Sequence, residues 1–367
     1  MQRLSRPRRR RVTAFGAVSS VALLALLGLV GGAAAAASPT DRGQAGGAVI
    51  GPSTTNGRIR ALTYNVAGLP EPLSGSEPSV NTPLISPRLN AYDLVLVQED
   101  WIDPDPPVPP WDFHHDDLIS QVTHPYRSTP ATPPIGTDPR RPEALVADGL
   151  NRLSRYPFGS VTRRMWAGCF GGADTSDGGA GDCLALKGFS VARTEVDPGV
   201  EIDVYNVHGE AGGTELDEQL RADGYRQLAE FMTVHSAGRA VILGGDTNLH
   251  TDRPGAGAIW SEFLAATGLT DVCQAVDCGA DDHEIDKFAF RSGGGVTIEA
   301  LSHAFERDEF RRDDGEPLSD HDPLAVEFSW THVWDGPSDP AAPRPAGPPA
   351  ARGATPVAVA GRVSYTG

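Results

Sequence analysis

Five short polar clusters lie at the boundaries of apolar runs, and they constrain the fold of this chain more than any other feature. They are Thr63-Tyr64-Asn65, Gln98-Glu99, Asn206-Val207-His208, Gly245-Asp246-Thr247-Asn248 and Ser319-Asp320-His321. Carboxylates, amides and imidazoles are costly to bury without partners. Because this cost recurs at the ends of apolar runs, we expect those ends to converge on one polar site.

The apolar runs beside the clusters predict strands. The first four clusters each follow a run, at residues 59–62, 94–97, 202–205 and 240–243, whereas the fifth precedes one at 323–328. Short runs without polar alternation are typical of strands that are buried on both faces. We therefore expect the clusters to stand at the ends of buried strands.

Helical signals alternate with these strands. Apolar residues recur at helical spacing between Thr214 and His235, and Thr214 with Asp217 resembles a capping box at the start of that helix. A short helix is expected to begin at Thr82-Pro83, and a further one spans about 256–266. The alternation predicts the α/β class, with helices packed on sheets. The pattern alone leaves open whether there is one sheet or two.

The two ends of the chain have compositions that differ from the rest. Residues 1–37 hold an arginine-rich start, an apolar core at 15–30 and an alanine run, which together predict a signal peptide and secretion. An uncleaved membrane anchor is the alternative, although the apolar core is shorter than the ~20 residues of a spanning helix. We expect a flexible N-terminal segment at 38–57, a catalytic domain at 58–335 and a disordered Pro/Ala/Gly-rich tail at 336–367.

The charge of the chain disfavours a polyanionic partner. The formal net charge is −17, and removal of the six arginines in residues 1–37 would bring it to −23. Nucleic-acid-binding proteins usually carry a basic stripe, and the sequence shows none. A nuclease is not excluded by this, because a bound cation can invert the local field.

Four cysteines, in a chain expected to be exported, indicate disulfides. Pairing of sequence neighbours would join Cys169 to Cys183 and Cys273 to Cys278. Four cysteines allow three connectivities, so the other two stay open. A zinc site is disfavoured, since no Cys-x-x-Cys or paired histidines accompany them.

Each polar residue also has a simpler explanation. Asn65 could cap a turn, Glu99 could form an ordinary salt bridge, and His208 could be a core histidine. The segments 245–248 and 319–321 fit polar turns. Their combination points to chemistry, because Glu and Asp hold hard cations, Asn binds phosphate or water, and His moves protons. The set predicts metal-assisted attack on a phosphate ester.

In order and spacing the clusters, together with Ile285-Asp286, resemble the endonuclease/exonuclease/phosphatase superfamily, over about residues 58–329. The resemblance implies a DNase I-like four-layer α/β/β/α sandwich of two packed mixed sheets with helices outside. The segments 148–157 and 182–189, with Cys169, are similar to those of bacterial neutral sphingomyelinases and their secreted relatives. The DNase branch shares these segments less closely.

The resemblance implies a metal site and a phosphate site. Glu99 would be the main Mg²⁺ ligand with Asn65 beside it, and Asp320 would orient the site or hold a second ion. Mn²⁺ or Ca²⁺ would also accept these oxygen ligands. Asn65, His208 and Asn248 would contact the phosphate.

The same resemblance implies the roles in proton transfer. Asp246 and Asn248 would bind the attacking water and a phosphate oxygen, and His321 would take the proton of that water. His208 would stabilise or protonate the opposite side of the phosphate, and Asp286 would align an imidazole. These residues are all present in the sequence.

The expected reaction is hydrolysis of sphingomyelin to ceramide and phosphocholine by a secreted monomer that contacts the membrane peripherally. A secreted endonuclease that cleaves DNA, and a non-catalytic binding module, are the alternatives. Two departures from the family pattern bear on the substrate. Val207-His208 replaces the usual Thr-His, and residues 292–316 contain Phe305 and Phe310 but neither Trp nor Tyr. Because Trp and Tyr favour a bilayer interface, efficient attack on intact membranes is in doubt.

Overall fold

The computed structural model describes residues 53–103, 111–134 and 137–334. The predicted signal peptide, most of the N-terminal segment and the tail lie outside these residues, so the proposed domain bounds stay predictions. The helices are α1 (Pro78–Arg88), α2 (His115–Ile119), α3 (Glu215–His235), α4 (Pro254–Thr267) and α5 (Val272–Val276). In the described ranges, no helix combines the length and apolarity needed to cross a bilayer.

The strands form two mixed sheets of six strands each. In order across the first sheet they are β11 (Val296–Phe305), β12 (Leu324–Trp334), β1 (Ser53–Asn65), β2 (Leu94–Gln98), β4 (Asn151–Ser154) and β3 (Tyr126–Arg127). In the second they are β5 (Thr162–Met165), β6 (Gly188–Asp197), β7 (Val200–His208), β8 (Val241–Asp246), β10 (Asp286–Arg291) and β9 (Thr270–Asp271). The β1–β2 and β7–β8 pairs are parallel and the other pairs are antiparallel.

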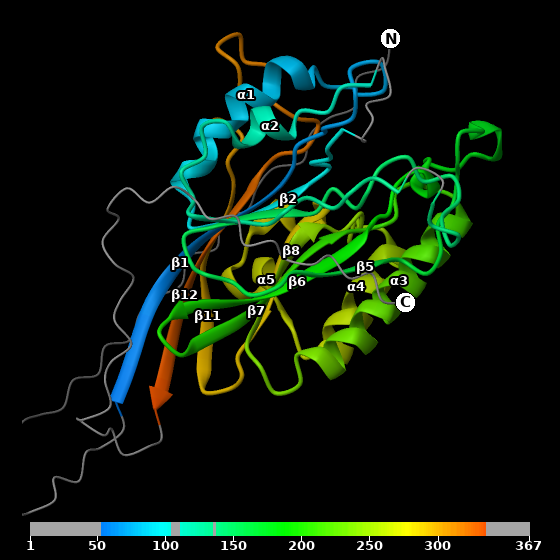
Figure 1. Ribbon diagram of the computed structural model, residues 1–367. Coiled ribbons are helices and arrows are strands. Elements are labelled where there is room, and N and C mark those ends of the chain that lie inside the picture. Colours follow the sequence, from blue (N-terminus) through cyan, green and yellow to red (C-terminus); the bar gives the residue numbers. More distant parts are fainter. Residues whose placement is uncertain (1–52, 104–110, 135–136, 335–367) are drawn as a thin grey trace, which may run out of the picture. The chain divides into compact units, whose positions relative to one another are not determined.

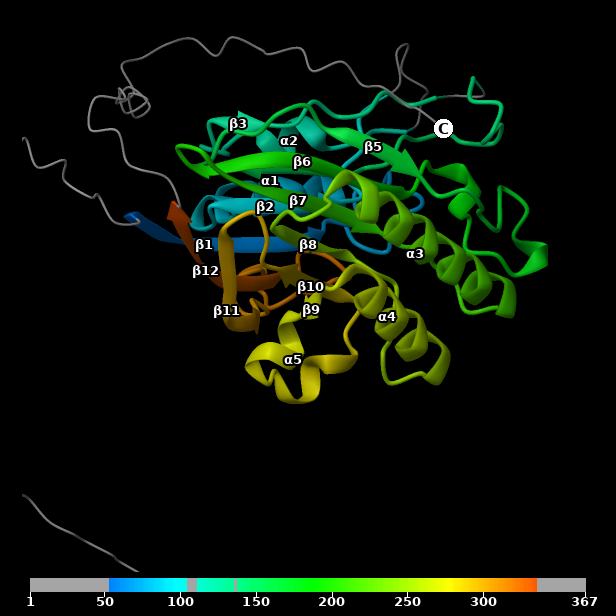
Figure 2. The ribbon, with the colours of Figure 1, turned by 90° about the horizontal axis from the view of Figure 1, so that it is seen from below.

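Helices cover the outer face of each sheet, so the predicted four-layer arrangement is confirmed. Figures 1 and 2 show α1 and α2 on one side, and α3 and α4 on the other. The strands supply both faces by alternation. In β8, Ile242 packs between the sheets, whereas Val241 and Leu243 pack under α3 and α4. This two-sided burial explains why the sequence of the strand is apolar throughout.

Buried polar side chains bridge the two sheets. Arg152 of β4 donates to the carbonyl oxygen of Val204 and to Ser190 Oγ, each at 2.9 Å. Complete burial lowers the pKa of Arg152 to about 9. Closer to the polar clusters, Gln98 Nε2 donates to Asn206 Oδ1 at 2.7 Å. These hydrogen bonds satisfy groups that would be costly to bury alone, and they fix how one sheet lies on the other.

The long helix begins and ends as predicted, whereas the first helix does not. Thr214 accepts from the backbone N–H of Asp217, and the Asp217 side chain accepts in return, so the capping box is confirmed. The first helix starts at Pro78 and not at Thr82-Pro83, because Pro78 occupies the first turn, where no backbone N–H is needed. Leu84 of that helix is exposed.

Both disulfides join sequence neighbours, as expected. Cys169 is bonded to Cys183, and Cys273 to Cys278. The first bond closes the Gly- and Asp-rich loop that precedes β6. The second joins Cys273, within α5, to Cys278, two residues after that helix ends.

The strand register brings the polar clusters to one edge of the sandwich. Asn65 pairs opposite Gln98 at the ends of β1 and β2. In the second sheet, Asp246 pairs opposite His208 on one side and opposite Asp286 on the other. Within each sheet, the expected convergence of strand ends is thus set by backbone pairing.

Gly245 is the position where this register tolerates no side chain. Its φ is 154°, and an added Cβ would lie 2.0 Å from the carbonyl oxygen of Val207 on the neighbouring strand. We expect Gly245→Ala to lower the free energy of unfolding by about 2 kcal/mol or more, as measured by urea denaturation. Gly75→Ala is the matched control, because no atom lies within 4 Å of its added Cβ. Equal stability of the two variants would contradict the prediction.

Candidate active site

Asn65 joins the two sheets at the centre of the site. Its Nδ2 donates to Glu99 Oε1 and to Asp246 Oδ2, each at 3.1 Å. Its Oδ1 accepts from the backbone N–H of Ala67 at 3.0 Å. Asn65 therefore holds two carboxylates together through its nitrogen, and its predicted role as a metal ligand stays a prediction.

Glu99 is presented by a strained backbone. Its φ of 58° lies in the left-handed region, which costs a residue with a side chain about 1 kcal/mol or more. Gly68 and Gly149 make room for this backbone. A Cβ added at Gly68 would lie 2.2 Å from the Glu99 carbonyl oxygen, and a Cβ added at Gly149 would lie 3.1 Å from the Glu99 Cα. Burial raises the pKa of Glu99, and Lys187 and Asn65 oppose that rise.

His321 and Asp286 form a short pair. His321 Nδ1 lies 2.7 Å from Asp286 Oδ2, and Nε2 lies 3.6 Å from Asp246 Oδ2. Burial disfavours the charged imidazole, but Asp286 and Asp246 outweigh it and raise the pKa of His321 well above its ordinary value. The predicted alignment of an imidazole by Asp286 thus has the required geometry.

His208 lies on the other side of Asp246 and has the opposite tendency. Its Nε2 is 3.4 Å from Asp246 Oδ2 and 3.7 Å from Glu99 Oε1. Burial, with smaller contributions from Lys187 and His321, lowers the pKa of His208 well below its ordinary value. The pKa values of the two imidazoles are therefore shifted in opposite directions although both face Asp246.

Asn248 lies beside this group, and Asp320 lies outside it. The Asn248 backbone N–H donates to Asp246 Oδ1 at 3.0 Å, and its Nδ2 donates to the Gly209 carbonyl at 3.1 Å. Asp320 is exposed, and in the described part of the chain its one hydrogen bond is from Ser319 Oγ, at 3.3 Å. The structure thus does not bring the predicted metal ligand Asp320 into contact with Glu99 or Asn65.

Lys187, a mostly buried charged group close to Glu99, could not be predicted as part of the site from the sequence. Lys187 Nζ lies 2.5 Å from Asp182 Oδ1. Burial opposes its charge, but Asp182 and Glu99 outweigh this and raise the pKa of Lys187. Burial and then Asp182 raise the pKa of the neighbouring Glu210 to about 8. The Asp182–Lys187 segment was noted only for its resemblance, because nothing in the sequence places it beside Glu99.

The donor set of the site fits a divalent cation. Asp246, Asp286 and His321 each offer a ligand atom, and these atoms lie within 4.8 Å of one another. Asp286 Oδ1 is buried without a hydrogen-bond partner among the described residues. Burial raises the pKa of both Glu99 and Asp246, so their negative charges lack full compensation. Carboxylate oxygens of this kind suit hard cations.

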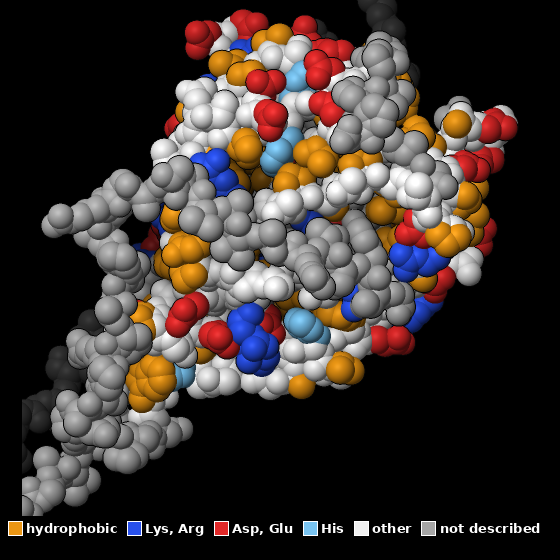
Figure 3. Space-filling view, in the orientation of Figure 1, with side chains coloured by type: hydrophobic (Ala, Val, Ile, Leu, Met, Phe, Trp, Pro, Cys, Tyr) orange, Lys and Arg blue, Asp and Glu red, His pale blue; other side chains and the backbone are white. Residues whose placement is uncertain are grey.

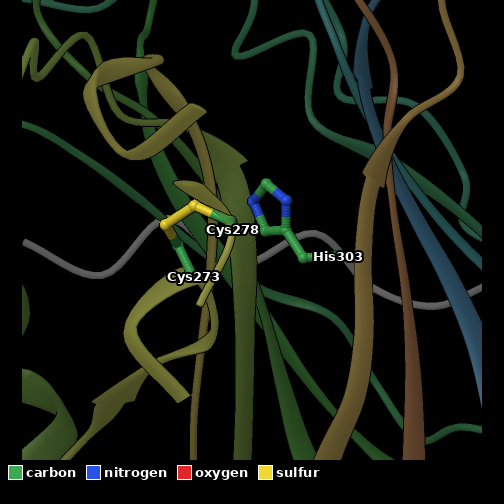
Figure 4. Close-up of side chains that lie close together, drawn as sticks. All are labelled: Cys273, Cys278 and His303. Carbon is green, nitrogen blue, oxygen red and sulfur yellow. A yellow bond between two sulfur atoms is a disulfide. The ribbon is translucent and has the colours of Figure 1, made fainter. Parts of the chain in front are cut away.

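A second group of three side chains does not fit a metal. Cys273, Cys278 and His303 lie close together, as Figure 4 shows, but the two sulfur atoms are joined in a disulfide. A metal ligand from cysteine must be a thiolate. We therefore place no metal there.

Comparisons with known proteins bear on the whole of this arrangement. No protein-family model matches the chain. Sphingomyelinases of Mycobacterium bovis and Mycobacterium tuberculosis are each 34% identical to it over 296 residues, which cover 76% of this chain and 54% of theirs. The chain is a sphingomyelinase homologue. It spans about half the length of these curated relatives.

Solved structures identify the fold of this chain. Beta toxin of Staphylococcus aureus aligns with a TM-score of 0.51 at 17% identity, over 73% of this chain and 99% of the toxin. SmcL aligns with a TM-score of 0.50 at 15% identity, over 74% of this chain and 99% of SmcL. This chain therefore has the DNase I-like fold that its sequence predicted.

The His321–Asp286 pair makes a prediction about protonation. In Asp286→Asn, with EDTA present, the pKa of His321 should fall, because the negative partner of its Nδ1 is removed. NMR titration of the imidazole measures this, and Asp252→Asn, which changes an exposed acid, is the control. An unchanged pKa would contradict the pairing.

The same pair predicts how stability depends on pH. The folded pKa of His321 exceeds its unfolded value, so the pair stabilises fully below the unfolded pKa and loses this effect as pH rises through the folded one. The advantage of wild type over Asp286→Asn in urea denaturation should shrink across that window. A constant difference would count against the linkage.

Proposed function

We propose that the chain is a secreted, Mg²⁺-dependent phosphodiesterase that hydrolyses sphingomyelin to ceramide and phosphocholine. The observation that carries the proposal is the polar site at the strand ends, where His208 and His321 flank Asp246 and Asn65 links Asp246 to Glu99. Homology to the mycobacterial sphingomyelinases supports the choice of substrate. The two disulfides support export.

The cation would be held by Glu99 with Asp246 as its neighbour, because burial leaves the charges of both carboxylates without full compensation. Bound there, it would neutralise the phosphoryl group and, by repulsion, lower the pKa of His321. For Asn65 and Asp320 to act as metal ligands, their side chains would have to turn toward Glu99 and Asp246. Mn²⁺ or Ca²⁺ would suit the same oxygen ligands.

The two imidazoles divide the proton transfers. His321, aligned by Asp286, would accept the proton of a water that Asp246 and Asn248 orient. Burial lowers the pKa of His208, and the N–H of a neutral imidazole would stabilise the leaving oxygen by donating a hydrogen bond to it. In-line displacement needs the attacking and leaving oxygens on opposite sides of phosphorus, and the two imidazoles lie on different sides of Asp246.

The surface favours a lipid over nucleic acid as the substrate. On the face seen in Figure 3, the described basic side chains form separate groups among acidic ones and not a continuous stripe. The net charge of −17 adds a general repulsion of polyanions. We propose peripheral contact of a monomer with its lipid substrate.

The central test compares two substrates and two metal conditions. Purified protein is incubated with sphingomyelin vesicles or plasmid DNA, each with Mg²⁺ or with EDTA. We expect phosphocholine release with Mg²⁺ and vesicles, and none with EDTA. Nicking of plasmid without phosphocholine release would replace the proposal by the nuclease alternative. Binding of vesicles without release of either product would favour the non-catalytic module.

Two substitutions test the assigned residues. Asp246→Ala and His321→Ala should each reduce hydrolysis at least about 10²-fold, because each removes a group that acts in proton transfer or orients the water. Asp252→Ala, an exposed acid outside the site, is the control and should retain activity. Circular dichroism checks that each variant is folded. A folded and fully active His321→Ala variant would refute its role.

A further inference from the structure

One arginine connects the two segments that carry the His321–Asp286 pair. Arg307 stands at the start of the loop between β11 and β12, and its Nε lies 2.6 Å from Asp322 Oδ2. Its Nη2 lies 3.4 Å from Asp281 Oδ1 and 3.3 Å from Glu284 Oε1. A single guanidinium therefore contacts three carboxylates from two separate parts of the chain.

These three acids are close in sequence to the pair. Asp322 directly follows His321. Glu284 precedes Asp286 by two residues, and Asp281 lies in the 3-10 turn Gly279–His283 before it. Arg307 thus links the segment that carries His321 to the segment that carries Asp286, whose carboxylate accepts a hydrogen bond from the His321 Nδ1–H.

Other contacts anchor these two segments separately. The Asp286 side is fixed to β8, because the Ile285 carbonyl accepts from Thr247 N at 2.8 Å and Thr247 Oγ1 at 2.6 Å. The His321 side is fixed to β1, because Ser319 Oγ donates to the Asn65 carbonyl at 2.7 Å. These anchors hold each segment to a different sheet, and Arg307 is a direct side-chain contact between the two segments themselves.

We propose that Arg307 is a positioning residue that holds His321 against Asp286. Its effect on turnover rests on the proposed function, whereas its effect on the pair does not. Without Arg307, Asp322 would face Asp281 and Glu284 with no cation between them, and repulsion would move the two segments apart. The ring of Phe305, whose centroid lies 4.7 Å from the guanidinium carbon, restricts where the arginine can go.

Arg307 is a surface residue, and this separates positioning from stability. Its side chain is 38% exposed, and exposed ion pairs contribute about 0–1 kcal/mol to folding. A misplacement of about 1 Å at a reacting group, however, can cost as much as 10²-fold in rate. We therefore expect Arg307→Ala to disturb the geometry of the site while leaving the midpoint of urea denaturation nearly unchanged.

The first readout is the hydrogen bond itself and needs no activity. The Nδ1–H of His321 bonded to Asp286 should give a downfield proton signal, assigned by its loss in His321→Gln. We expect this signal to weaken or vanish in Arg307→Ala and to return in part in Arg307→Lys, which keeps the charge but lacks the fork of donors. Arg312→Ala is the matched control, because Arg312 lies in the same loop but contacts Glu77 and Asn81.

The second readout is turnover on sphingomyelin vesicles with Mg²⁺. We expect kcat to fall about tenfold in Arg307→Ala with KM within about twofold, and Arg312→Ala to match wild type. Adding Asp322→Asn to Arg307→Ala should recover part of the loss, since it removes one of the repelling carboxylates. An intact signal and an unchanged kcat in Arg307→Ala would overturn the proposal. A lost signal in a protein that is inactive from the start would uphold the positioning role and reject the proposed function.

Discussion

The pairing of β8 with its two neighbours is the constraint on which the rest of the site depends. Because β7 runs parallel to β8 and β10 runs antiparallel to it, His208 and Asp286 fall on either side of Asp246. A shift of one residue in either register would turn one of these side chains to the opposite face of the sheet. The glycine at position 245 allows β7 to approach at this point, where an added Cβ would meet the Val207 carbonyl. The close spacing of the acids and imidazoles is therefore a property of the backbone before it is one of the side chains.

The first sheet contributes through buried polar bridges. Gln98 connects Thr63 and Asn206, and it lies directly before Glu99. The bridge is fully buried, and such networks give specificity when every member has a partner. It fixes the position of the end of β2 relative to β7. Glu99 and His208 therefore approach each other from opposite sheets. The strained backbone of Glu99 then directs its carboxylate into that space.

Local sequence predicted what depends on local rules. The capping box at Thr214, the strand ends at Asn65 and Asp246, and the neighbour pairing of cysteines all follow from spacing and residue type. The position of Lys187 behind Glu99 could not be predicted, because it depends on packing of segments about 90 residues apart. Asp320 shows the converse limit. It stands in a motif of the expected type, yet the turn that contains it points its side chain to solvent.

The first and last described strands are neighbours, since β1 pairs with β12 from Ser53 and Trp334 to Thr63 and Leu324. Asn65 ends the former and His321 precedes the latter, so this pairing brings the earliest and the latest parts of the site together. A ribosome or an export channel delivers the chain from its N-terminus, and β1 must then wait for nearly the whole domain before its partner emerges. The site is therefore complete only after His321 has emerged, and a chain interrupted between β10 and His321 has the acids Glu99, Asp246 and Asp286 but not the imidazole that faces Asp286.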